Sequence, residues 1–184
     1  MDIDVGPIGP GDDAVLLLDL LNSTPVVDDA PADQWPDAAA LRRWLGARGL
    51  PVGAASLTAA RAVREDLQQS VWGGRAPQAV AGWLDGVHRV PRVGDHGGLV
   101  WHTRCPDGGQ LAVRAVLAYF ALAELRPGRL RPCGNPECRL FLLDTSRSNT
   151  ARWCSMATCG NRLKARRHHA RSRGAAGSAD RLQP

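Results

Sequence analysis

Apolar residues recur at helical spacing through most of the N-terminal two thirds of the chain. The segment AVLLLDLLN, which follows Asp13, predicts a short apolar helix, and the repeat over residues 37–48 predicts a second helix that ends before Gly49. Ser56 is a favourable N-cap for a third, amphipathic helix. Residues 111–125 are apolar almost all round, which is typical of the central helix of a small bundle.

The pattern changes between the third helix and the central one. Pro77 is expected at the first position of a fourth helix, although Gly82 and Gly86 each weaken that helix by about 1 kcal/mol relative to alanine. Residues 90–93 and 99–102 have the composition of two short strands that form a β-hairpin. The pattern therefore predicts a mainly α fold with a small helical N-terminal domain that includes a short hairpin.

The composition agrees with a folded protein of modest size. The chain has 184 residues, of which 44% are hydrophobic and 22% charged, so full-length disorder is excluded. Every apolar run is far shorter than the roughly 20 residues that a membrane span needs. The first residues are acidic where a signal peptide would be basic, so we expect a cytoplasmic protein without a membrane partner.

The net charge of +5 is unevenly distributed. Residues 1–127 carry 11 arginines against 15 acidic residues, a net charge of −4, whereas residues 128–184 carry 12 basic residues against 3 acidic ones, a net charge of +9. This asymmetry indicates a C-terminal segment that binds a polyanion, or a merely solvated tail. We expect a helical domain over 1–127, a basic module over 128–173 and a disordered tail over 174–184.

The cysteines are clustered in the same basic segment. Cys133, Cys138, Cys154 and Cys159 form two pairs, each with four intervening residues, whereas Cys105 stands alone and is interpreted as an ordinary loop thiol. In a reducing compartment such clustering indicates a metal site more than disulfides. Four thiolates about 2.3 Å from the ion are the common donor set of structural zinc. The sequence therefore predicts one structural Zn²⁺ on these four cysteines.

The residues between the two pairs predict how the site is built. The segments RLFLLD and TARW have strand character, and a hairpin between them would bring the second pair beside the first. Positions five apart on a helix differ by about 140°, so Cys154 and Cys159 cannot both point from a helix body toward one ion. We expect Cys154 to end a strand and Cys159 to lie in the first turn of a helix through residues 161–173. A knuckle, a hairpin and a basic helix in this order form a treble-clef-like module.

Two other kinds of metal site are alternatives for these cysteines. A Cys₃His zinc site could include His168 or His169, but both lie more than two helical turns beyond Cys159 and would point away. Four cysteines can also hold an iron–sulfur cluster. The small framework of two cysteine pairs favours zinc over the cluster.

The segments PCGNPEC, LFLLDTSR and RWCSMATCGNRLKAR resemble the CGNR-type zinc finger, which is named after the tetrapeptide found here at residues 159–162. The segments DLLN, ALRRWLGARGL and LVWHT resemble the ABATE region that commonly precedes such fingers. The resemblance implies a transcription regulator, stress-induced in some members, and a metal role for the four clustered cysteines. The chain departs from the family pattern at Ser148-Asn149, where Asn-Gly is common, and at Ala151, where a basic residue is expected.

The expected helix after the last cysteine is densely basic, and no acidic residue offsets it before Asp180. Lysine and arginine side chains on such a helix suit contacts to phosphates. A solvated helix, or one docked on the acidic N-terminal domain, is the alternative. Asn161 and Arg162 are as consistent with a structural role beside the metal loop as with a nucleic-acid contact. The predicted nucleic-acid-binding residues are Arg162, Lys164, Arg166, Arg167, Arg171 and Arg173.

No catalytic motif stands out, and four thiolates would leave the metal without an open position, so we do not expect an enzyme. The leading hypothesis is a zinc-dependent DNA-binding transcription regulator whose partner is double-stranded DNA, although the sequence does not separate DNA from RNA. Its N-terminal domain would sense a small-molecule effector or mediate homodimerisation. The alternative hypothesis is a protein-interaction adaptor whose zinc module is structural.

Overall fold

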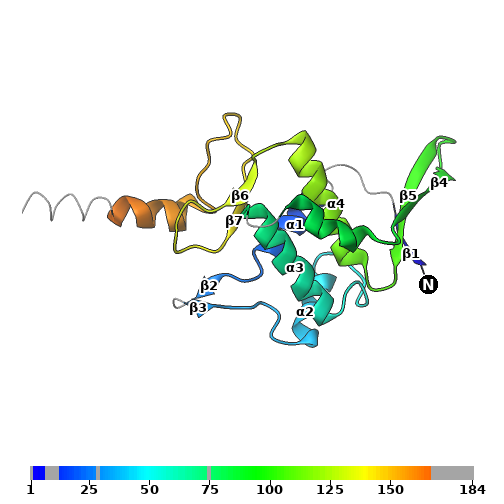
Figure 1. Ribbon diagram of the computed structural model, residues 1–184, viewed down its shortest axis with the longest axis horizontal. Coiled ribbons are helices and arrows are strands. Elements are labelled where there is room, and N and C mark those ends of the chain that lie inside the picture. Colours follow the sequence, from blue (N-terminus) through cyan, green and yellow to red (C-terminus); the bar gives the residue numbers. More distant parts are fainter. Residues whose placement is uncertain (1, 7–12, 28–29, 74–75, 167–184) are drawn as a thin grey trace, which may run out of the picture.

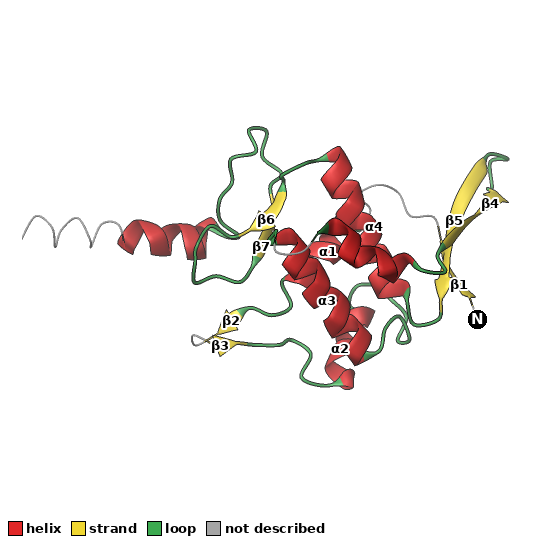
Figure 2. Cartoon of the chain, in the orientation of Figure 1, coloured by secondary structure: helices red, strands yellow, loops and turns green. Residues whose placement is uncertain are grey.

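A computed structural model describes residues 2–6, 13–27, 30–73 and 76–166 of the chain. Its centre is a group of helices around one long, largely buried helix, α4, against which α1 and α3 pack (Figure 1). Short sheets lie at either end of this group (Figure 2). Its helices are α1 (Ala14–Leu21), α2 (Ala38–Gly46), α3 (Leu57–Val71) and α4 (Gln110–Leu125).

Side-chain caps begin α2 and α3, and a glycine follows the end of α2; Ser56 and Gly49 are in the places expected from the sequence. The Asp37 side chain accepts a hydrogen bond from the Ala40 N–H at 2.7 Å and so caps α2. Ser56 caps α3 in the same way, with its hydroxyl 3.1 Å from the Ala59 nitrogen. Gly49 has a φ of +69° just beyond α2, a conformation that glycine adopts without strain. The four helices expected from hydrophobic spacing and caps at 14–22, 37–48, 56–73 and 111–125 are thus confirmed except for their exact ends.

The hydrophobic core lies between α1, α3 and α4. Leu17, Leu67 and Leu111 are fully buried, and each such side chain stabilises the fold by about 1.5–3 kcal/mol. Trp35 is also fully buried and packs edge-on against Trp44 of α2, with ring centroids 4.9 Å apart. These side chains form the centre of the main hydrophobic core.

The fourth helix differs from the prediction. Residues Pro77–Leu84 form a 3₁₀ helix, η1, with Pro77 at its start, instead of an α-helix. Of this segment only Val80 is buried, so packing does not enforce the wider α-helical turn. Gly82 loses more backbone freedom on folding than alanine would, which lowers the α-helix propensity of this segment.

The expected hairpin is present and has a third strand that the sequence reading missed. Strands β4 (His88–Val93) and β5 (Leu99–Pro106) pair antiparallel, and β1 (Asp2–Gly6) pairs with the other edge of β5. The interpretation of Cys105 as a loop thiol is wrong, because Cys105 lies in β5 and is fully buried. This sheet lies at the opposite end of the molecule from the clustered cysteines (Figure 1).

The strands near the cysteines pair differently from the prediction. Strand β7 (Phe141–Leu143) does form, but it pairs antiparallel with β6 (Leu130–Pro132), which directly precedes the first clustered cysteine. The TARW segment, residues 150–153, is not a strand. Both strands lie against the helical body, since β6 contacts α3 and β7 contacts α1. A second short pair, β2 (Val26–Val27) with β3 (Ala30–Pro31), lies beyond α1.

No helix within the described ranges is long and apolar enough to cross a bilayer. The expected tail at 174–184 lies outside the described residues.

Candidate metal centre

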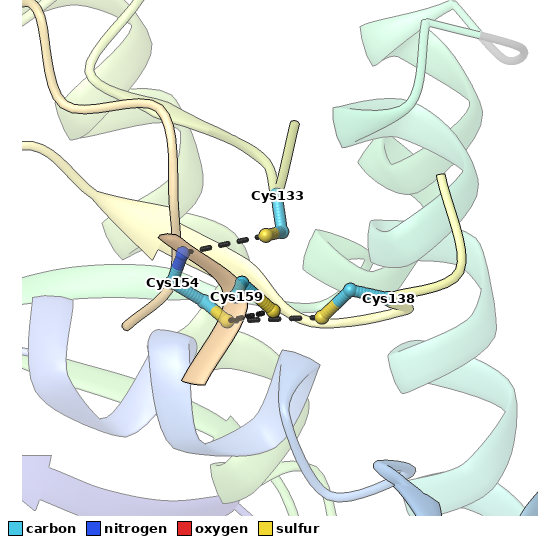
Figure 3. A group of neighbouring side chains, drawn as sticks. All are labelled: Cys133, Cys138, Cys154 and Cys159. Atoms are coloured by element: carbon cyan, nitrogen blue, oxygen red, sulfur yellow. Dashed lines mark hydrogen bonds between the residues drawn. The ribbon is translucent and has the colours of Figure 1, made fainter. Parts of the chain in front are cut away.

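The four clustered cysteines converge on one point. Their sulfur atoms all lie within 4.8 Å of one another, and the sulfur of Cys154 is 3.7 Å from those of both Cys138 and Cys159 (Figure 3). A tetrahedral ion with metal–sulfur bonds of about 2.3 Å requires sulfur–sulfur distances of about 3.8 Å. The predicted ligands thus have the spacing and the chemistry of one structural zinc site, and Cys105 is not among them.

Two short turns place the sulfur atoms. Cys133 follows β6, its N–H donating to the Leu140 carbonyl at 2.8 Å, and Cys138 closes a turn by donating to the Asn135 carbonyl at 2.9 Å. On the other side, Cys159 lies in a single helical turn, η2 (Met156–Gly160), which Ser155 caps. A helical segment over 161–166 follows. Cys159 therefore lies in the first turn of the basic helix, as expected, whereas Cys154 lies in a loop instead of ending a strand.

Backbone and amide N–H groups point at the sulfur atoms. The Cys154 nitrogen is 3.4 Å from the Cys133 sulfur, and the Leu140 nitrogen is 3.5 Å from the Cys138 sulfur. The Asn135 side-chain amide donates to the Cys159 sulfur at 3.6 Å. Such donors stabilise thiolates and orient metal ligands. Asn135, which the sequence analysis did not single out, is therefore part of the site.

The pKa values of the clustered thiols show why the site needs the positive charge of a metal ion. Burial raises the pKa of Cys138 to about 11, and burial together with the adjoining thiols also raises the pKa of Cys154. Burial opposes ionisation of Cys159 as well, but hydrogen bonds from Asn135 and the neighbouring thiols bring its pKa below the usual value. A bound divalent cation would provide the positive charge that four adjacent thiolates require.

Two glycines allow the close packing around the cysteines. A Cβ on Gly134 would lie 3.0 Å from the Arg152 carbonyl oxygen and 3.1 Å from the Trp153 ring. A Cβ on Gly160 would lie 2.8 Å from the Met156 sulfur and 3.2 Å from the same indole. Both glycines directly follow a cysteine and precede an asparagine, so the tripeptide Cys-Gly-Asn occurs once on each side of the site. Trp153 packs between the two turns.

A buried ion pair fixes the loop that joins the two cysteine pairs. The Asp144 carboxylate is fully buried and accepts hydrogen bonds from Arg131 and, at 2.8 Å each, from the Ser146 and Ala151 N–H groups. Hydrogen bonding from Ser146, then from Ala151, and the Arg131 guanidinium hold the pKa of Asp144 below its usual value against burial. Arg131 also donates to the Ala151 carbonyl. This pair ties the loop to β6, a role for which no local sequence pattern exists.

The metal module is joined to the helical body by hydrogen bonds and by ring packing. The Phe141 N–H donates to the Asn22 side-chain oxygen at 2.8 Å, and the Asn22 amide donates to the Phe141 carbonyl at 3.2 Å. The Phe141 ring is buried and packs against Trp72, with centroids 5.1 Å apart. Phe141 is therefore part of the main hydrophobic core.

The basic helix is described only at its start. Arg162 and Lys164 are exposed, and neither forms an ion pair within the described part of the chain. Arg166 instead pairs with Glu137 of the first cysteine turn. Asn161 is exposed, and among the described asparagines it is Asn135 that bonds the cysteine cluster. The other predicted nucleic-acid contacts, Arg167, Arg171 and Arg173, lie outside the described residues, as do His168 and His169.

Comparison with protein-family models gives two matches that divide the chain. Residues 129–172 match the CGNR zinc finger, and residues 14–126 match the ABATE family, described as "Putative stress-induced transcription regulator". Among curated proteins, none matches the sequence of this chain. The ABATE match covers more than half of the sequence, and the finger match includes all four clustered cysteines. The chain therefore belongs to the ABATE family and carries a CGNR zinc finger at its C-terminal end.

Proposed function

We propose that this protein is a zinc-dependent transcription regulator that binds double-stranded DNA through its finger. The observation that carries the proposal is the basic helical segment that leaves the cysteine cluster and extends away from the helical body (Figure 1). Arg162 and Lys164 are exposed there, available to phosphates, and free of ion pairs within the described ranges. Each phosphate contact from such side chains gains free energy by releasing counterions.

The charge around the finger supports a polyanionic partner. Residues 128–184 have a net charge of +9, and the two acidic residues of this segment that the structure describes, Glu137 and Asp144, are each paired with an arginine. Arg147 and Arg152 are exposed on the loop between the cysteine pairs. The basic surface therefore extends beyond the helix to this loop.

In this proposal the zinc ion has a structural role. Four thiolates would complete its tetrahedral shell, so no open position remains for a substrate, and we assign the protein no enzymatic activity. Zinc would instead fix the turn of Cys159, from which the basic helix starts, relative to β6 and β7. Reduced cysteines of this kind suit the cytoplasm.

The helical domain would pass a signal to the finger, by binding a small-molecule effector or by forming a homodimer. Support comes from the Asn22–Phe141 hydrogen bonds, which join the end of α1 to β7. A change in the position of α1 would therefore reach the finger directly. A protein-interaction adaptor is the second candidate, favoured by the exposed apolar side chains Val93, Leu99 and Trp101 on the β4–β5 hairpin.

Fluorescence anisotropy of labelled duplex DNA, titrated with the zinc-loaded chain at several salt concentrations, tests the proposal. Replacing Arg162 or Lys164 by glutamine should weaken binding and reduce the slope of log K against log salt by about 1 each. Arg42→Gln, on the exposed face of α2, is the matched control and should change neither quantity. Binding that does not depend on salt, or that survives charge reversal at Arg162 and Lys164, would favour the adaptor.

A further inference from the structure

A cleft of about 320 Å³ lies where α3, the β2–β3 hairpin and the first cysteine turn meet. Its walls include three guanidinium groups, those of Arg61, Arg64 and Arg139, together with the Trp72 ring and Pro31. Binding sites for small molecules are commonly found at such junctions, and the volume is near the lower end of their range. The cleft is separate from the four cysteines and has no role in holding the metal.

Two of the arginines are held in place by one carboxylate. Asp33 accepts from Arg64 at 2.9 and 3.1 Å through both of its oxygens, and from the Arg61 Nε at 3.0 Å. Arg64 is buried and lies over the Trp35 ring, with its guanidinium carbon 4.6 Å from the ring centroid. Asp33 therefore fixes the orientation of Arg61 and Arg64 while neutralising only one of their two charges.

The third arginine comes from the finger. Arg139 directly follows the metal-ligating Cys138, and its guanidinium carbon lies 5.9 Å from the Trp72 ring centroid. Its side chain is exposed and has no ion-pair partner in the described part of the chain. Among the described residues of the cleft wall, Glu65 is the one acidic side chain, and its Oε1 accepts from Gln69. Within the described ranges, three guanidinium groups therefore face two carboxylates around the cleft, those of Glu65 and Asp33.

We infer that this cleft binds a small organic anion, a carboxylate attached to a flat apolar group. The carboxylate would accept charge-assisted hydrogen bonds from Arg139 and the arginines that Asp33 orients, and the flat group would lie against Trp72 and Pro31. Such a ligand contacts α3 of the helical domain and Arg139 of the finger at once. The inference gives the effector-sensing part of the proposed function a site, and it does not depend on nucleic-acid binding.

Calorimetric titration of the zinc-loaded full chain with benzoate, and with neutral benzamide of nearly the same shape, tests the inference. We expect benzoate to bind at least about tenfold more tightly than benzamide, because only the carboxylate uses the guanidinium groups. Arg139→Gln should weaken benzoate binding about tenfold. Arg152→Gln, an exposed arginine elsewhere on the finger, is the matched control and should leave benzoate affinity unchanged.

The location of the ligand is tested by fluorescence. Benzoate should quench part of the tryptophan emission, and Trp72→Phe, which keeps an aromatic ring against Phe141, should remove that quenching. Equal affinity for benzoate and benzamide, no binding of benzoate, or tight binding of inorganic phosphate without benzoate would each overturn the inference. So would an Arg139→Gln variant that loses DNA affinity but keeps benzoate affinity. Arg162→Gln should reduce DNA binding and leave benzoate binding intact, so the two proposals fail separately.

Discussion

Asn22 and Phe141 lie 119 residues apart in the chain and are joined by two hydrogen bonds, one in each direction between the Asn22 amide and the Phe141 backbone. The Asn22 side chain thereby occupies the place of a neighbouring strand on the free edge of β7. With the Phe141 ring buried against Trp72, this contact makes the finger and the helical domain one packed unit.

Replacing Asn22 by leucine should destabilise the whole chain. The substitution leaves the Phe141 N–H and carbonyl without partners in a part-buried position, which costs about 1–3 kcal/mol of unfolding free energy. Urea denaturation of the zinc-loaded protein measures this loss. Asn161→Leu, at an exposed asparagine, is the control. Equal stability of the two variants would show that the contact does not couple the finger to the body.

Removing the Phe141 ring should destabilise the finger and the helical domain together. Phe141→Ala removes a fully buried ring from the core that the finger shares with α1 and α3, so we expect a loss of about 3–5 kcal/mol. Phe141→Leu should lose clearly less, because it fills most of the volume. Thermal unfolding followed by circular dichroism measures both. A separate, unshifted unfolding of the helical domain in Phe141→Ala would contradict the shared core.

The two glycines beside the cysteines should differ in their response to alanine. In Gly134→Ala the new Cβ meets a backbone carbonyl at 3.0 Å, whereas in Gly160→Ala its closest contact is the flexible end of Met156. We therefore expect zinc affinity, measured by chelator competition, to fall about tenfold or more in Gly134→Ala and less in Gly160→Ala. Gly53→Ala, where a Cβ meets nothing within 4 Å, should not change it. The reverse order would contradict the packing described.

Asp33 should make the fold sensitive to acid. Burial opposes its ionisation, but the hydrogen bonds from Arg64 and from the Trp35 N–H, together with the charges of Arg64 and Arg61, outweigh burial and lower its pKa. A lowered pKa stabilises the folded state above the unfolded value of about 3.9, and this contribution is lost as the pH falls through the folded pKa. Asp33→Asn should therefore be less stable than the parent chain at pH 7, and the difference should shrink below about pH 4.

Chemical denaturation of the parent chain and Asp33→Asn between neutral and acidic pH measures this difference. Asp95→Asn, at an exposed carboxylate, provides the control. A stability difference that stays constant over the whole range would mean that the Asp33 charge does not stabilise the fold.

The pair between Glu137 and Arg166 should limit DNA binding. Both side chains are half exposed, so the pair itself is worth at most about 1 kcal/mol. Glu137→Gln removes a negative charge from the finger and releases Arg166, and we expect DNA affinity to rise about two- to fivefold with a steeper salt dependence. Anisotropy titrations of Glu137→Gln beside Glu124→Gln, on α4, measure this effect. Unchanged affinity would mean that Arg166 does not contact DNA even when it is free.

The features that the sequence reading predicted correctly depend on neighbours in the chain. The cap at Ser56 and the spacing within each cysteine pair involve residues a few positions apart, so their chemistry is visible in a short window. The pairing of β7 with β6 was missed because TARW has equal strand character, and tertiary packing through Phe141 decides between them. Asn22 likewise carries no local signal of its partner.

The charges of the site were predictable only in part. The excess of basic residues after Cys159 is visible in the composition, but the pairing of Arg166 with Glu137 depends on how the two cysteine turns face each other. Asp144 ends the RLFLLD segment, whose strand character gives no sign that this carboxylate is fully buried. The Cys-Gly-Asn tripeptide at 133–135 resembles that at 159–161, and only the structure distinguishes the asparagine that bonds a ligand sulfur.

Metal analysis of the purified chain tests the central claim most directly. The structure predicts one zinc per chain, bound by Cys133, Cys138, Cys154 and Cys159, and a cobalt-substituted protein with the spectrum of tetrahedral thiolate coordination. Cys159→Ser should lose the zinc and unfold the helical segment after it, whereas Cys105→Ser should keep one equivalent. One equivalent of zinc retained in Cys159→Ser, or visible iron–sulfur bands in the purified protein, would contradict the account.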